Sequence, residues 1–188
     1  MKYPHISEGT KDAVIDKLGG EEGAMRFLAG EVVLQFIDRK LQTTDPFDPT
    51  KFVGKTWKVI DTETDARAAR LQEVDFARVN GEVCLRPEDG GAITGEEKLR
   101  RLREGGNILL GSNAFLALWR EKDHQTLEWL FREKNASFFE FYGELLMDRG
   151  GSIFVLCVFR EEHARWRWGY LWVGKDRTAR HLALAIVP

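Results

Sequence analysis

The C-terminal part of the chain is organised around one stretch, Arg165-Trp166-Arg167-Trp168-Gly169-Tyr170-Leu171-Trp172-Val173. Successive side chains of a β-strand point to opposite faces of the sheet. In a strand, one face of this stretch would therefore carry Trp166, Trp168, Tyr170 and Trp172. The other face would carry Arg165, Arg167, Gly169, Leu171 and Val173. The alternation predicts a strand with one strongly aromatic face.

Further strands are predicted on both sides of this stretch. Ser137 to Gly143 and Ile153 to Arg160 come before it, and His181 to Val187 follows it. The loops between them are short, as at Asp148-Arg149-Gly150-Gly151, and short loops join antiparallel neighbours. The last part of the chain is therefore predicted to form an antiparallel β-meander.

Three helical segments are predicted between residues 94 and 134. Thr94-Gly95-Glu96-Glu97 has the form of a capping box at the start of the first segment. Ser112 and Asp123 can cap the next two, and apolar residues at helical spacing follow each of them. We expect these helices to cover one face of the sheet.

The N-terminal third has the pattern helix, helix, strand. Thr10 can cap a first helix that ends at Gly19, and a second helix is expected from about Glu21 to Ala29. The β-branched and aromatic residues 32–37 then predict a strand. Residues 61–91 show no clear period, and their structure is left open.

Length and composition favour one folded domain. A chain of 188 residues can build one good-sized core, and twelve Phe and six Trp supply large side chains to fill it. We therefore predict a single α+β domain over residues 1–188. Its C-terminal antiparallel meander is packed on one face by several short helices, and an N-terminal helix-helix-strand unit precedes it.

The charge and the cysteines narrow the cellular context. The formal net charge of -2 gives the molecule no general attraction to nucleic acid or anionic lipid. Cys84 and Cys157 form no dense disulfide framework, which indicates a reducing compartment. The N-terminus lacks a signal-peptide pattern and no window has the length of a membrane span. We expect a cytoplasmic protein without a membrane partner.

Three stretches carry a resemblance to known sequences: Leu18-Gly19-Gly20-Glu21-Glu22-Gly23-Ala24, the segment from Gly95 to Leu102, and Trp166-Arg167-Trp168 with Tyr170 and Trp172. Together they resemble an uncharacterised family of small proteins from candidate-phylum, uncultured bacteria. No activity, cofactor or catalytic residue is known for that family. The resemblance therefore implies a bacterial protein with a coherent single fold, and it transfers no site.

The aromatic row has two interpretations. The rings can pack against the helices of residues 94–134, where each would bury roughly 150 to 250 Å². Alternatively, Trp168 and Trp172 can stack on the bases of a single-stranded nucleic acid, with Arg165 and Arg167 close by. Because a sheet must cover one face in any case, the core interpretation is favoured.

The arginine side of the same strand has two interpretations as well. Arg165 and Arg167 can bind a phosphate or a carboxylate ligand. More often such arginines form a solvated sheet face, here paired across strands with Glu140 or Glu161. The candidate binding residues are therefore Arg165, Arg167, Trp168 and Trp172.

Two other sites have weaker support in the sequence. The glycine-linked N-terminal helices can offer backbone amides to DNA phosphates, but the acidic Glu21 and Glu22 would repel them. A nucleophilic Cys157 can pair with His163 or His181, although a cysteine between Leu156 and Val158 is more often an inert buried thiol.

The sequence contains no metal-ligand spacing, no phosphate-cradling loop and no Gly-x-Ser-x-Gly motif, so we expect no cofactor and no metal. We therefore predict a small cytoplasmic binding or interaction protein without catalytic activity. Protein is favoured over nucleic acid as the partner. A single-stranded nucleic-acid binder is the first alternative and a Cys-His hydrolase the second.

Overall fold

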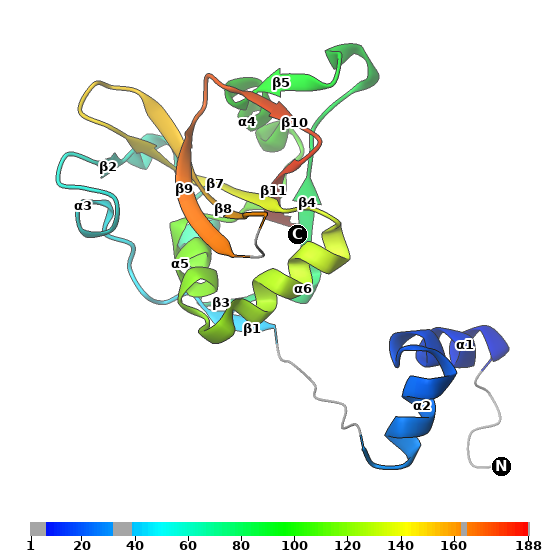
Figure 1. Cartoon of the computed structure of the whole chain (residues 1–188). Coiled ribbons are helices and arrows are strands. Elements are labelled where there is room, and N and C mark those ends of the chain that lie inside the picture. Colours follow the sequence, from blue (N-terminus) through cyan, green and yellow to red (C-terminus); the bar gives the residue numbers. More distant parts are fainter. Residues whose placement is uncertain (1–6, 32–38, 163–164, 188) are drawn as a thin grey trace. The chain divides into compact units, whose positions relative to one another are not determined.

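The computed structural model describes residues 7–31, 39–162 and 165–187. The contacts within it divide the chain into two units, Met1–Asp38 and Arg39–Pro188, which are described separately (Figure 1). Both helices and sheets are present and most strand pairs are antiparallel, which confirms the predicted α+β class. That the two units form a single domain stays a prediction.

The N-terminal unit contains the two predicted helices, α1 (Glu8–Lys17) and α2 (Gly20–Leu28). Ser7, rather than Thr10, is the N-cap of α1, because its hydroxyl accepts the backbone N–H of Thr10 at 3.2 Å. Within the described part of this unit, no side chain of either helix is buried. The strand predicted at residues 32–37 lies outside the described residues.

The second unit is built on a seven-stranded sheet. Five strands lie side by side in the order β4-β11-β7-β8-β9, while β2 also pairs with β7 and β6 with β11. The bounds are β2 (Lys58–Val59), β4 (Val79–Glu82), β6 (Ile108–Leu109), β7 (Phe138–Met147), β8 (Ile153–Arg160), β9 (Trp166–Trp172) and β11 (His181–Ile186).

The predicted meander is present in β7, β8 and β9, which are consecutive antiparallel neighbours. The last strand behaves differently, because β11 does not pair with β9. It lies on the far side of β7 and runs parallel to it. The chain reaches that position through β10 (Asp176–Thr178), which pairs with β5 (Ala92–Thr94) and leads away from the edge of the main sheet.

The segment left open by the sequence consists of short elements. It contains the 3-10 helices η1 (Asp61–Glu63), η2 (Ala68–Arg70), η3 (Phe76–Arg78) and η4 (Pro87–Asp89), together with β3 (Glu73–Asp75) and β4. Strand β3 pairs with β1 (Lys40–Gln42), and β4 joins the main sheet beside β11. The short helix α3 (Pro49–Phe52) precedes this segment. No helical or strand period could develop over elements of this length.

The three predicted helices are α4 (Gly95–Glu104), α5 (Ser112–Arg120) and α6 (Gln125–Lys134), with η5 (Lys122–His124) between the last two. Thr94 caps α4 as predicted, accepting the N–H of Glu97 at 3.2 Å. Ser112 is the first residue of α5 and Asp123 lies in η5, so neither has the predicted place before its helix.

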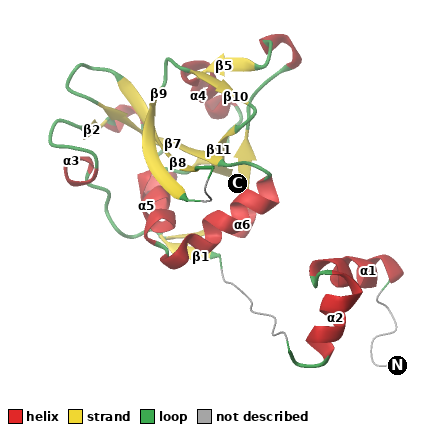
Figure 2. Ribbon diagram, in the orientation of Figure 1, coloured by secondary structure: helices red, strands yellow, loops and turns green. Residues whose placement is uncertain are grey.

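The helices cover both faces of the sheet, as Figure 2 shows. Helices α5 and α6 supply Phe115, Leu118, Leu127 and Leu130 to one apolar cluster, which includes Phe139 and Phe141 of β7. Helix α4 supplies Leu99 and Leu102 to a second cluster that includes Tyr142. Because neighbouring residues of β7 are apolar on both faces, cover on one face alone would leave part of the strand in water.

Candidate binding surface on strand β9

Strand β9 lies at one end of the main sheet (Figure 1). In the described chain its only strand partner is β8, with the register running from Phe154 opposite Trp172 to Arg160 opposite Trp166. Among the described residues, one long edge of β9 therefore has no neighbouring strand. This edge and the two faces beside it form the candidate surface.

The first half of the aromatic row belongs to the core. Trp166 is 8 % exposed, and its indole N–H donates to Glu128 Oε1 on α6 at 2.8 Å. The ring of Trp168 lies 4.5 Å from that of Phe52 and 6.2 Å from that of Phe115, centroid to centroid. These two tryptophans fix β9 to the helical layer.

The second half of the row is open to solvent. Tyr170 is 44 % exposed and Trp172 is 47 % exposed. The ring of Tyr170 lies 4.5 Å from Trp57 and 5.5 Å from Phe154, so it is supported from behind while its outer side stays free. The row therefore changes from core to surface between Trp168 and Tyr170.

The two candidate arginines are exposed, Arg165 just before β9 and Arg167 within it, and both pair with one acidic residue. Arg167 Nε is 3.3 Å from Glu161 Oε2, and Arg165 Nη2 is 3.5 Å from the same oxygen. Glu161 is one of the two partners that the sequence offered for these arginines. By strand alternation Arg167 points to the face opposite Trp168 and Trp172, so the structure does not gather the four candidate residues on one face.

The backbone groups on the open edge of β9 follow from its hydrogen bonds to β8. Val173 N–H donates to Ile153 O at 3.0 Å, and Arg165 O accepts from Glu161 N–H at 2.9 Å. In an antiparallel pair, alternate residues bond to the partner strand, so the odd-numbered residues of β9 face β8. The N–H and C=O groups of Trp166, Trp168 and Tyr170 therefore point away from the sheet.

The C=O group of Trp172 is not free, although residue 172 is also even-numbered and faces the open edge. Its C=O accepts Lys175 N–H at 3.1 Å and Arg177 Nη2 at 3.1 Å. In the part of the chain that the structure describes, the open edge thus offers a complete set of N–H and C=O groups at three residues, Trp166, Trp168 and Tyr170. The sequence could show the alternation but not the edge, because it did not show that β11 lies beside β7.

The residue Glu140, considered as a partner of the arginines, lies elsewhere. Its carboxylate accepts Lys98 Nζ at 2.9 Å and also Arg177 Nε, and all three side chains are buried. Lys98 Nζ also donates to His181 O at 2.6 Å. This buried ion cluster of Lys98, Glu140 and Arg177 ties α4 and β10 to the sheet, and solvent does not reach it.

A groove lies between α4 and the ends of β7, β8 and β9. Its apolar floor consists of Leu99, Leu145, Ile153 and Val173, and its volume is about 590 Å³. Most charged residues of the rim pair with one another or with neighbours, as Arg103 does with Glu63 and Arg100 with Glu97. At this end of β9, Val173 thus lines the groove on one face of the sheet, while the exposed Trp172 lies on the other face.

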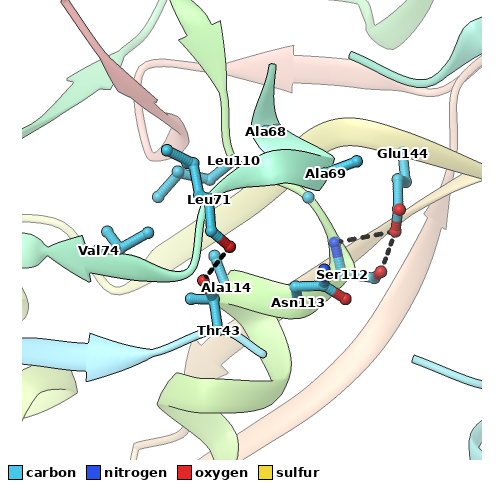
Figure 3. Close-up of a pocket in the computed structure, with 11 residues that line it drawn as sticks. Thr43, Ala68, Ala69, Leu71, Val74, Leu110, Ser112, Asn113, Ala114 and Glu144 are labelled. Atoms are coloured by element: carbon cyan, nitrogen blue, oxygen red, sulfur yellow. Dashed lines mark hydrogen bonds between the residues drawn. The ribbon is translucent and has the colours of Figure 1, made fainter. Parts of the chain in front are cut away.

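A smaller cavity lies at the start of α5, as Figure 3 shows. Glu144 accepts the backbone N–H of Ser112 at 3.2 Å and also its hydroxyl, while the hydroxyl of Thr43 donates to Leu71 O at 2.6 Å. Burial raises the pKa of Glu144. The cavity volume is about 10 Å³, which is the space of a single water molecule, so this carboxylate caps the helix and binds no larger ligand.

The structure does not assemble the Cys157 dyad within the described residues. Cys157 is buried, and burial together with the charge of Glu140 raises its pKa to about 12, which keeps the thiol protonated at neutral pH. His181 Nδ1 accepts Thr178 N–H at 3.2 Å, and no hydrogen bond joins a described histidine to the thiol. His163 lies outside the described residues.

Comparison with family models, curated proteins and solved structures gives no match. In the ranges that the structure describes, no group of three or more His, Cys, Asp or Glu side chains is placed to hold a metal ion. None of the described helices combines the length and the hydropathy needed to cross a bilayer. Function is therefore inferred from the geometry of β9.

Proposed function

We propose that this protein binds other macromolecules without catalytic activity of its own, and that it does so by accepting an extended polypeptide strand at the open edge of β9. The observation that carries this proposal is the row of backbone groups at Trp166, Trp168 and Tyr170, which point away from β8. Strand addition at a sheet edge takes its affinity from such main-chain groups and its specificity from alternate side chains.

The two ends of the sheet differ in how they are protected. Monomeric proteins blunt their edges with short strands, prolines or lysines. The strand at the other end, β4, has only the four residues Val79–Glu82. Strand β9 is longer, at seven residues, and contains neither proline nor lysine. An edge of this length and composition is suited to be covered by a partner.

The exposed aromatic side chains support the same proposal. Tyr170 and Trp172 stand on one face of the edge, and Tyr170 is held in place by Trp57 and Phe154. Large aromatic rings are enriched at the centres of protein interfaces, where they bury much area at little cost in side-chain entropy. A partner strand paired with Tyr170 would lie against its ring.

A single-stranded nucleic acid is the second candidate, favoured by the same two exposed rings. Bases can stack on aromatic residues that alternate along a strand. Against this, the nearby Arg165 and Arg167 both pair with Glu161, and the net charge is -2. Trp168, one of the rings considered for stacking, packs against Phe52 and Phe115. These contacts favour a polypeptide partner.

The test is capture from a native lysate of the source organism with the wild-type chain and with Tyr170→Lys, which places a charge at the edge. Val187→Lys is the matched control, because Val187 is also exposed and lies outside β9. We expect the wild type and the control to capture a protein that Tyr170→Lys does not. Equal capture by all three, or capture that a nuclease abolishes, would overturn the proposal.

A further inference from the structure

We infer that the strand that covers β9 is β9 of a second copy of this chain, antiparallel to the first about a twofold axis at Trp168. This inference rests on the proposed strand addition and specifies its partner. It follows from the backbone groups that are free, from the side chains on the two faces, and from the symmetry of such a pairing.

The free backbone groups select one register. In an antiparallel pair of identical strands, a twofold axis at Trp168 places Trp166 opposite Tyr170 of the second copy and Trp168 opposite itself. All the edge groups of Trp166, Trp168 and Tyr170 are then paired in both copies. An axis at Gly169 would require Trp172, whose C=O already accepts Lys175 N–H and Arg177 Nη2. With an axis at Arg167, Tyr170 would face a position before the start of β9 in the second copy, so its N–H and C=O groups would have no partner in that strand.

The side chains are compatible with this register. On the face opposite the aromatic row, Arg167 falls across from Gly169 of the second copy, so no like charges face each other. Gly169 has room around it, because a Cβ there would meet only Phe159 at 3.5 Å and Cys157 Sγ at 3.8 Å. The stem of Arg167 can therefore lie over the glycine of the other copy. On the aromatic face, Tyr170 falls across from Trp166 of the second copy, whose ring is only 8 % exposed and stays bonded to Glu128 of its own chain, so no charge opposes Tyr170 there.

Symmetry explains why a second copy fits better than an unrelated strand. A twofold interface uses the same surface twice, so each group must be complementary to a group of the same strand. The edge of β9 meets this condition, because its three outward residues are evenly spaced about Trp168. Pairing would join two sheets into one and remove the long unprotected edge from both copies.

The experiment is sedimentation equilibrium of the full chain over the micromolar range, with Gly169→Lys and Gly169→Glu as a matched pair. We expect a dimer of the 21.6 kDa chain. Because residue 169 faces Arg167 of the other copy, lysine should raise the dimer dissociation constant about tenfold or more, while glutamate should preserve or lower it. Equal effects of the two substitutions would overturn the register.

Amide hydrogen exchange of the wild-type chain tests the inference without any substitution. Raising the concentration should slow exchange at Trp166, Trp168 and Tyr170, and should leave Arg167, Gly169 and Leu171 unchanged because they already bond to β8. A wild type that stays monomeric, with no such change, overturns the second copy as partner. If that monomer still captures a protein in a Tyr170-dependent way, the proposed function stands; if it does not, both fail.

Discussion

Strands β7 and β9 belong to the same sheet and are both rich in aromatic residues, but their environments differ. Strand β7 has strand neighbours on both edges and apolar clusters on both faces. Strand β9 has one strand neighbour in the described chain, and its aromatic face is buried at Trp166 and exposed at Trp172. Two strands with similar patterns therefore occupy the centre and the rim of one sheet.

The charges of the two strands show what separates them. Glu140 of β7 is buried and holds Lys98 and Arg177 in the interior. Arg167 of β9 is exposed and pairs with Glu161 at the surface. A charge inside a strand therefore does not mark it as peripheral, because the strand can be central when its charge has buried partners.

The largest expected effect comes from removing the buried charge of β7. Replacing Glu140 by Gln leaves Lys98 and Arg177 buried without a counter-charge, and we expect a loss of about 3–5 kcal/mol in the free energy of unfolding. Urea denaturation followed by circular dichroism measures it. The matched control Glu161→Gln breaks only exposed pairs and should cost about 1 kcal/mol or less. Equal losses of unfolding free energy in the two variants would contradict the assignment of a buried charge to β7 and surface charges to β9.

The next largest effect is a difference in stability between substitutions at the buried and the exposed end of β9. Trp168→Ala should cost about 3 kcal/mol, because it removes a ring that packs against Phe52 and Phe115. Trp172→Ala should cost no more than about 1 kcal/mol in the isolated chain, because about half of that side chain is exposed. Thermal unfolding of both variants at low protein concentration gives the comparison. A larger loss at Trp172 would show that the row does not change from core to surface where the structure places the change.

The smallest expected signal concerns Cys157, which lies on β8 between the two strands, opposite Glu140 on one side and Gly169 on the other. Its pKa of about 12 and its burial predict almost no reaction with a thiol reagent at pH 8 in the folded chain. A Cys84→Ser background isolates this thiol, and urea should restore labelling. Rapid labelling of the folded chain would instead support the Cys-His alternative.

Local pattern was sufficient for much of the fold. The alternation in Trp166–Trp172 predicted β9, and the apolar run Ile153–Arg160 between short turns predicted β8. The capping box at Thr94 predicted the start of α4. The order of the strands was not predictable in this way. The apolar sequence of β11 is compatible with a place beside either β9 or β7, and the structure places it beside β7, reached through β10.

The candidate site could be predicted only in part for a similar reason. The sequence placed Trp168 and Trp172 on one face and the arginines on the other, but it did not show that the row is covered at one end only. That depends on Phe52, Phe115 and Trp57, which are distant in the chain. The partners of Glu140 were missed as well, because Lys98 and Arg177 lie far from it in sequence.

The sequence by itself determined which residues of β9 share a face, where α4 begins and that helices and antiparallel strands would coexist, because each of these depends on neighbours a few residues apart. Only the tertiary structure decided that β9 is a terminal strand, that Tyr170 and Trp172 stay exposed and that Glu140 is buried with two cations. These features arise from contacts between segments far apart along the chain, and the period of a single segment carries no information about them.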